Sequence, residues 1–136
     1  MNVILDTNVL MSAIFWGGNP RKILDLWMED RFRLVGSKEI VNEYEEIFLR
    51  LNQKYKTADS SILNAVLAHI WMMDASKLPD PVCEDSDDDK FLACALACAL
   101  ASSAKYIVTG DKLLLKVGKF HSTEIAIVSK FLRAFS

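Results

Sequence analysis

Short apolar runs, each followed by a longer segment with helical periodicity, constrain the fold of this 136-residue chain more than any other feature. Runs of about four residues suit strands that are buried on both faces, and they predict strands at residues 2–5, 32–35, 106–109 and 124–127. Apolar residues at helical spacing predict helices at residues 7–15, 20–30, 37–51, 58–73, 88–102 and 129–135, with a shorter helix within residues 110–119. Strands that alternate with helices predict an α/β fold in three layers, a short central parallel sheet flanked by helices.

Length and composition predict one compact domain over residues 1–136. Hydrophobic residues make up 51% of the chain, which excludes a disordered protein. Polar residues before two of the predicted helices are expected N-caps: Asn19, which precedes Pro20 at a first helical position, and Ser37. We find no internal repeat and no interdomain linker.

Apolar runs and cysteines predict the compartment. The longest apolar run, residues 91–101, falls well short of the ~20 residues that span a bilayer, and no secretory signal peptide opens the chain. Cys83, Cys94 and Cys98 lack CxxC spacing, and the last two lie in an apolar stretch where cysteine is expected to act as a small hydrophobic residue. We therefore expect a cytoplasmic protein that does not enter the membrane.

Two of the predicted strands lead into an acid. Asp6 directly follows the first strand, and Asp111 follows the strand at residues 106–109 after a single glycine. If these strands are parallel neighbours, both carboxylates lie at the edge of the sheet where α/β proteins bind ligands. Taken singly, Asp6 is equally well explained as a helix cap and Asp111 as a turn residue.

Two predicted helices supply further acids. Glu43 has Ile40 three residues before it and Ile47 four residues after it, so it is expected on the core-facing side of its helix. An acidic run opens the helix at residues 88–102, with candidates that share one face: Asp85, Asp88 and Asp89. Alone, a helical glutamate is usually solvated, and acids at a helix N-terminus are favoured by the helix dipole.

The combination of four acidic positions points to metal chemistry. Four carboxylates in one pocket repel each other, and a hard divalent cation such as Mg²⁺ compensates them through oxygen ligands. No histidine, cysteine or lysine belongs to the set, which disfavours zinc and Schiff-base chemistry. The chemistry that remains is hydrolysis of a phosphate ester, in which a bound cation lowers the pKa of the attacking water. The number of metal ions, one or two, stays open.

Four motifs in this order resemble the PIN-domain family over nearly the whole chain: LDTNVLMSAI, SKEIVNE, SDDDKFLACAL and YIVTGDKLLL. The resemblance implies a three-layer PIN-like domain with the family's metal-binding and catalytic acids at Asp6, Glu43, Asp88 and Asp111; Asp89 is the alternative third acid. It also implies that Asn8 and Thr109 line the site. The family implies a Mg²⁺- or Mn²⁺-dependent ribonuclease, commonly homodimeric, and the branch this chain most resembles contains toxins that are inhibited by a partner antitoxin.

RNA binding requires positive charge outside an acidic pocket, because phosphate contacts dominate affinity. The candidates are Arg21 and Lys22, which follow a Gly-Gly-Asn-Pro turn, and Lys112 beside Asp111. A non-catalytic module that binds RNA or protein on the same fold is the alternative function, and the presence of all four acids argues against it. The chain also lacks the DxDx[TV] motif of haloacid-dehalogenase-type phosphatases, because Thr7 and Asn8 follow Asp6.

Overall fold

The structure is a computed structural model that describes residues 1–56, 60–74 and 90–135. Within them, one sheet has the strand order β3-β2-β1-β4-β6-β5. Neighbouring strands are parallel except for the antiparallel pair β5 and β6. The strands are β1 (Asn2–Leu5), β2 (Arg33–Gly36), β3 (Trp71–Met72), β4 (Tyr106–Val108), β5 (Lys119–Phe120) and β6 (Thr123–Ala126).

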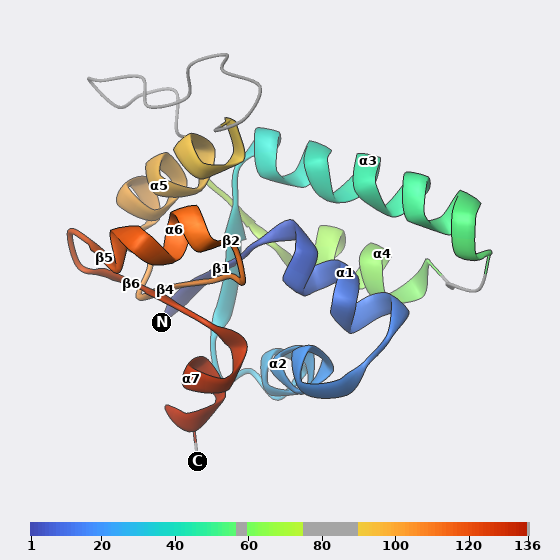
Figure 1. Ribbon diagram of the computed structural model, residues 1–136, viewed down its shortest axis with the longest axis horizontal. Coiled ribbons are helices and arrows are strands. Elements are labelled where there is room, and N and C mark those ends of the chain that lie inside the picture. Colours follow the sequence, from blue (N-terminus) through green and yellow to red (C-terminus); the bar gives the residue numbers. More distant parts are fainter. Residues whose placement is uncertain (57–59, 75–89, 136) are drawn as a thin grey trace.

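Helices cover both faces of this sheet, with α5 on one side and α2 and α7 on the other (Figure 1). Helix α1 packs against α2 and α3, and α3 in turn packs against α5. The helices are α1 (Thr7–Phe15), α2 (Gly18–Met28), α3 (Lys38–Tyr55), α4 (Ser61–His69), α5 (Lys90–Ser102), α6 (Lys112–Val117) and α7 (Val128–Arg133). The predicted α/β class, a short mostly parallel sheet flanked by helices in three layers, is confirmed.

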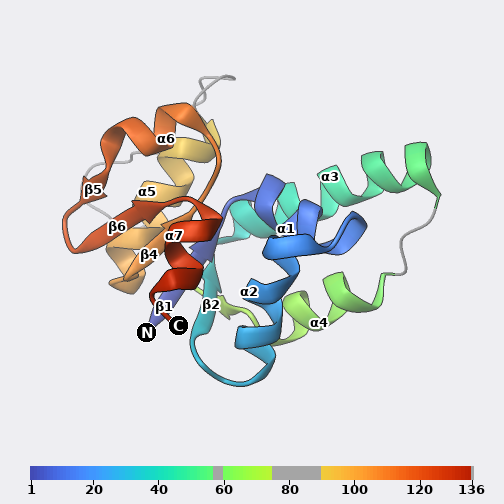
Figure 2. The same cartoon turned by 60° about the horizontal axis from the view of Figure 1, so that its bottom comes forward.

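The core lies where the central strands meet these helices. Ile4 and Ile107, paired across β1 and β4, are completely buried. The ring of Phe131 from α7 packs edge-on against Phe32 and Tyr106, with ring centroids 5.4 and 5.2 Å apart. Figure 2 shows α7 lying against the strands from this side. Burial of these side chains holds β1 in the interior of the sheet. Asp6, the next residue, therefore lies at the carboxyl end of this strand.

Two short edge strands were missed by the sequence prediction. The helix predicted over residues 58–73 ends at His69, and Ile70 turns into extended backbone with ψ 138°. Trp71 and Met72 then pair with β2 as the edge strand β3, and each side chain is 53% exposed. The prediction was wrong because residues 70–73 continue the apolar helical spacing, and two-residue strands such as β3 and β5 carry no period of their own.

The start of α2 differs from the prediction as well. The helix begins at Gly18, and its N-cap is Gly17 with φ 77°, so Asn19 lies inside the first turn instead of capping it. A positive φ is accessible to glycine without steric cost, which lets the chain reverse two residues earlier than expected. Pro20 is tolerated there because amide groups in the first turn have no intrahelical acceptor.

The cysteine prediction holds for one of the two described residues. The thiol of Cys98 is free and buried among apolar side chains, and burial raises its pKa to about 12. Cys94, one helical turn earlier, is disulfide-bonded, so the expectation that it acts only as a small hydrophobic residue is wrong. Over the described ranges, no helix combines the length and the apolar character needed to cross a membrane.

Ser37 caps α3 as predicted, and its side-chain oxygen accepts a hydrogen bond from the Ile40 amide at 3.4 Å. We expect Ser37→Ala to lower the free energy of unfolding by about 1 kcal/mol, measured by urea denaturation, because a buried helix end loses its acceptor. Ser60→Ala is the matched control, since Ser60 precedes α4 without a side-chain cap bond. Equal losses in both variants would contradict the capping role.

Candidate functional site

The strand order of the sheet reverses between β1 and β4: the chain proceeds from β1 to β2 and β3 on one side, and from β4 to β6 on the other. Such a switch point opens a crevice beyond the carboxyl ends of the strands, where α/β proteins bind ligands. Leu5 and Val108 are register partners at this end. The residues that follow them, Asp6 and Thr109, therefore meet in the crevice.

Asp6 is held by backbone and side-chain contacts across the switch point. Its amide donates to the Val108 carbonyl at 2.9 Å, and its carboxylate Oδ2 accepts a 2.6 Å hydrogen bond from Thr109 Oγ1. Asp6 is the N-cap residue of α1, but its side chain makes no cap hydrogen bond. The carboxylate thus points to Thr109 after β4 instead of capping α1. Asp6 is buried there, with only 6% of the residue exposed.

Asp111 joins the same edge through Thr109. The Asp111 amide donates to Thr109 Oγ1 at 2.9 Å, so one buried hydroxyl contacts both acid-bearing segments. The Asp111 carboxylate Oδ1 accepts from the Leu113 amide at 2.9 Å and caps α6. Asp111 itself is exposed and keeps its other carboxylate oxygen available for a ligand.

Glu43 reaches this edge from α3. It is half-buried, whereas the neighbouring Glu39, Glu45 and Glu46 are exposed, as the spacing of its apolar neighbours predicted. The Thr7 hydroxyl, one residue after Asp6, donates a hydrogen bond to Glu43 Oε2. The structure thus brings Asp6, Glu43 and Asp111 to one edge of the sheet; Asp88 and Asp89 lie outside the described residues.

The electrostatics of Asp6 reflect burial beside another acid. Burial is the largest effect and raises the pKa of Asp6. The hydrogen bond from Thr109 and the nearby backbone amides of Thr7 and Asn8 lower the pKa, while the negative charge of Asp111 raises it. The net result is a carboxyl group whose pKa lies above its ordinary range because its ionised form is poorly compensated.

Glu43 has the same imbalance. Burial raises its pKa most, the Thr7 hydrogen bond lowers it, and the charges of Asp6 and Glu46 raise it. Across the described segments, no lysine or arginine forms an ion pair with Asp6, Glu43 or Asp111. Within the described part of the chain, Asp6 and Glu43 therefore have no cationic partner when they ionise.

The donor set fits a hard divalent cation in its chemistry. The oxygens of Asp6, Glu43 and Asp111 are the ligands that Mg²⁺ and Mn²⁺ prefer, and these acids lack any other counter-charge in the part of the chain described. Among those residues, however, no three acids, histidines or cysteines are grouped closely enough to hold a metal ion. The predicted four-carboxylate set accordingly stays a prediction.

The raised pKa values predict how metal-free stability depends on pH. Between the ordinary and the raised pKa of Asp6 and Glu43, the folded protein holds protons that the unfolded chain has released. These two groups therefore contribute stability below pH ~4, and that contribution is lost as pH rises through the raised values. Urea unfolding in EDTA measures this dependence. The free energy of unfolding should decline less with rising pH in the Asp6→Asn, Glu43→Gln double variant than in wild type. The same pH profile in both proteins would contradict the assignment.

The predicted RNA-contacting residues are placed differently from one another. Arg21 is engaged at the C-terminal end of α1, where its Nε donates to the Ala13 carbonyl at 2.8 Å. Lys22 on α2 and Lys112 at the start of α6 are exposed. Hydrogen bonds to the end of α1 use only part of the Arg21 guanidinium and hold it at that helix end, whereas both lysine side chains are exposed to solvent.

Sequence analysis missed Thr7 as a partner of Glu43. The two residues lie 36 positions apart, and the hydroxyl donor is defined only by how α1 packs against α3. No local pattern marks this contact, since a threonine at the start of a helix is commonplace. The only signal was its position directly after Asp6.

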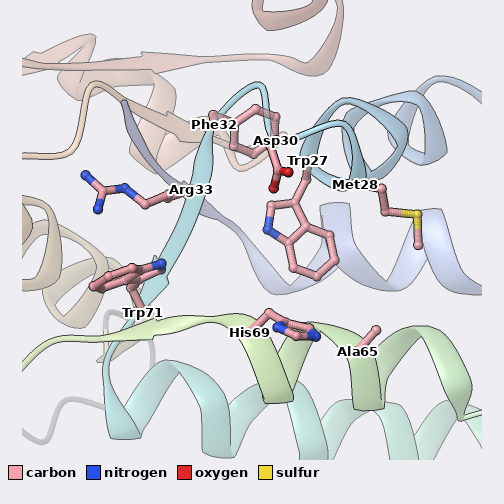
Figure 3. A pocket seen from close by; sticks show the side chains of 8 residues that line it. All are labelled: Trp27, Met28, Asp30, Phe32, Arg33, Ala65, His69 and Trp71. Atoms are coloured by element: carbon pink, nitrogen blue, oxygen red, sulfur yellow. The ribbon is translucent and has the colours of Figure 1, made fainter.

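A cavity of about 440 Å³ lies at the opposite end of the sheet, near the amino ends of β2 and β3 (Figure 3). Trp27 and His69 line its centre, and the Arg33 guanidinium lies 4.9 Å from the centroid of the Trp71 ring. None of the three convergent acids lines it. This cavity is therefore separate from the edge of the sheet that carries Asp6, Glu43 and Asp111, which we call the carboxylate edge.

Comparisons with known proteins agree with this fold. The family model described as "PIN domain" matches residues 2–113. The fold is similar to a chain in the crystal structure of VapBC2 from Rickettsia felis bound to a DNA fragment from their promoter, with a TM-score of 0.60 and 17% sequence identity. That similarity covers 93% of this chain and 98% of the other. A search of curated protein sequences finds no match.

A mostly parallel sheet with acids at its switch point defines an α/β protein of the class that binds ligands beyond its strand ends. The family match covers most of the chain, so this protein belongs to the PIN-domain family.

Proposed function

We propose that this protein is a divalent-metal-dependent endoribonuclease that hydrolyses RNA phosphodiester bonds. The observation that carries the proposal is the buried Asp6 carboxylate, which meets Thr109 at the switch point, faces the charge of Asp111 and has no protein cation among the described residues. A divalent metal ion would supply the positive charge that these acids need, and it would also bind the negatively charged phosphodiester.

The side chains have distinct roles in this proposal. Asp6, Glu43 and Asp111 would hold Mg²⁺ or Mn²⁺ together with Asp88, or with Asp89 in its place. Thr109 holds Asp6 and the Asp111 backbone at a common oxygen, and Thr7 orients Glu43. A bound divalent cation lowers the pKa of water and stabilises developing charge on phosphate oxygens. No histidine base is required, because a bound cation would itself lower the pKa of the attacking water.

Phosphate-bearing RNA also needs contacts outside the acids. Lys22 and Lys112 are exposed on α2 and α6, and Lys112 directly follows Asp111. Each contact to a phosphate releases counterions, so RNA affinity should fall steeply with salt. Asn8, exposed at the start of α1, would line the site beside Asp6.

The proposed biological setting is a toxin that a partner antitoxin inhibits. The similarity to a chain of the Rickettsia felis VapBC2 structure supports this setting. We further propose that residues 1–136 form one PIN domain, that it assembles as a homodimer and that it acts in the cytoplasm. Light scattering on the purified protein tests the oligomeric state directly.

Cleavage of a structured RNA in the presence of Mn²⁺ tests the proposed activity. We expect new internal RNA ends with Mn²⁺ or Mg²⁺, none with EDTA, and recovery of cleavage when Mn²⁺ is restored in excess. RNA that is bound but never cut under any metal condition would contradict the enzyme and support the alternative, a non-catalytic RNA-binding module on the PIN fold.

A further inference from the structure

A groove of about 430 Å³ is lined in part by Thr109, the residue that donates a hydrogen bond to Asp6. Its walls come from four segments that are far apart in the sequence: α1, the first turn of α2, the end of β4 and the start of α7. Its volume lies within the roughly 300–1,000 Å³ of typical small-ligand sites. The polar lining consists of Asn8, Ser12, Asn19, Thr109 and Ser129.

The groove carries no formal charge: none of its lining residues is Asp, Glu, Lys or Arg. A phosphate group is therefore poorly matched to it, because phosphate recognition relies on cationic side chains. Asn8 and Asn19 each present an amide oxygen and an amide nitrogen, so both can accept and donate hydrogen bonds. That combination matches the polar edge of a nucleobase.

The apolar part of the groove suits the face of a base. Val9 and Val128 line it together with Ile127, whose side chain is 43% exposed although it follows a buried strand. A flat ring laid across Ile127 would cover this exposed apolar surface while its edge meets the asparagines. Thr109 joins the two regions, because it lines the groove and also donates to Asp6.

We propose that this groove binds the nucleobase and ribose of the nucleotide next to the scissile phosphate, and that Asn8 and Asn19 read its base. The inference rests on the proposed ribonuclease function, for which the carboxylate edge receives the phosphate. Base preference at the cleavage site then comes from the neutral groove, and the acids contribute none.

Binding of neutral nucleosides tests the groove without any catalysis. Adenosine, guanosine, cytidine and uridine are titrated into ¹⁵N-labelled full-length protein without metal. At least one nucleoside should cause saturable changes in NMR chemical shift. We expect them at the side-chain amides of Asn8 and Asn19 and at the backbone amide of Gly110. Asn19→Ala should weaken that binding about tenfold, while Asn64→Ala on α4 leaves it unchanged. No saturable shift with any nucleoside, or equal binding by both variants, overturns the proposal.

Sequencing of cleavage ends from a random RNA pool in Mn²⁺ adds a second readout. Wild-type protein should prefer one base beside the cut, and Asn19→Ala should reduce that preference about tenfold. Nucleoside binding without RNA cleavage would refute the ribonuclease and leave the groove intact. Cleavage without base preference and without nucleoside binding would refute the groove and leave the ribonuclease intact.

Discussion

Asp6→Asn is expected to reduce metal-dependent RNA cleavage by about 1,000-fold or more, equivalent to about 4 kcal/mol of transition-state stabilisation. The substitution keeps the shape of the side chain and an oxygen that can accept from Thr109. It removes the negative charge at the switch point, which a divalent cation needs. Rates measured with a fluorescent RNA in Mn²⁺ test this expectation.

The same substitution should raise the stability of the metal-free protein at neutral pH. Ionised Asp6 is buried and faces the charge of Asp111, so the neutral amide is expected to be less costly in the folded state. Mn²⁺ should then stabilise wild type against heat and fail to stabilise the variant. Asp25→Asn, at an exposed position on α2, is the control. Equal cleavage by wild type and Asp6→Asn would refute the metal-site assignment.

Thr109→Val is expected to lower both stability and cleavage. Thr109 is completely buried, and valine fills its volume without the hydroxyl that donates to Asp6 and accepts from the Asp111 amide. Leaving these groups unsatisfied should cost about 1–3 kcal/mol in urea denaturation. Cleavage should fall about 10–100-fold, the range typical when a residue that orients a metal ligand is replaced.

The pH profile separates this role from a general loss of stability. The Thr109 hydrogen bond lowers the pKa of Asp6, so its removal should shift the acid limb of the cleavage profile to higher pH. Thr109→Ser retains the hydroxyl and should keep the wild-type profile even though it loses a buried methyl group. A Thr109→Val enzyme with reduced stability and an unshifted acid limb would show that Thr109 acts only in packing.

Much of the fold is predictable because its signals are local. The strand at Asn2–Leu5 and the helix at Thr7–Phe15 occur at the predicted residues, since apolar runs and helical spacing are properties of neighbouring positions. The Ser37 cap was predictable for the same reason. The edge strand at Trp71–Met72 was not, because a two-residue strand depends on β2 to pair with it.

The candidate site divides in the same way. Sequence placed Asp6 and Asp111 at strand ends and Glu43 on the inner side of its helix, where the structure places them. It could not show that Thr109 bonds Asp6 across 103 residues, or that Thr7 bonds Glu43. Those partners depend on which strands become neighbours and how helices pack on them.

By itself, the sequence determined the α/β class, the main strands and helices, and which acids could face one edge of the sheet. Only the tertiary structure decided that the Asp6 carboxylate turns to Thr109 instead of capping its helix, and that four distant segments form a neutral groove beside it. The reason is physical: periodicity and capping act over one or two helical turns, whereas burial and hydrogen bonding across the switch point require the whole sheet to assemble.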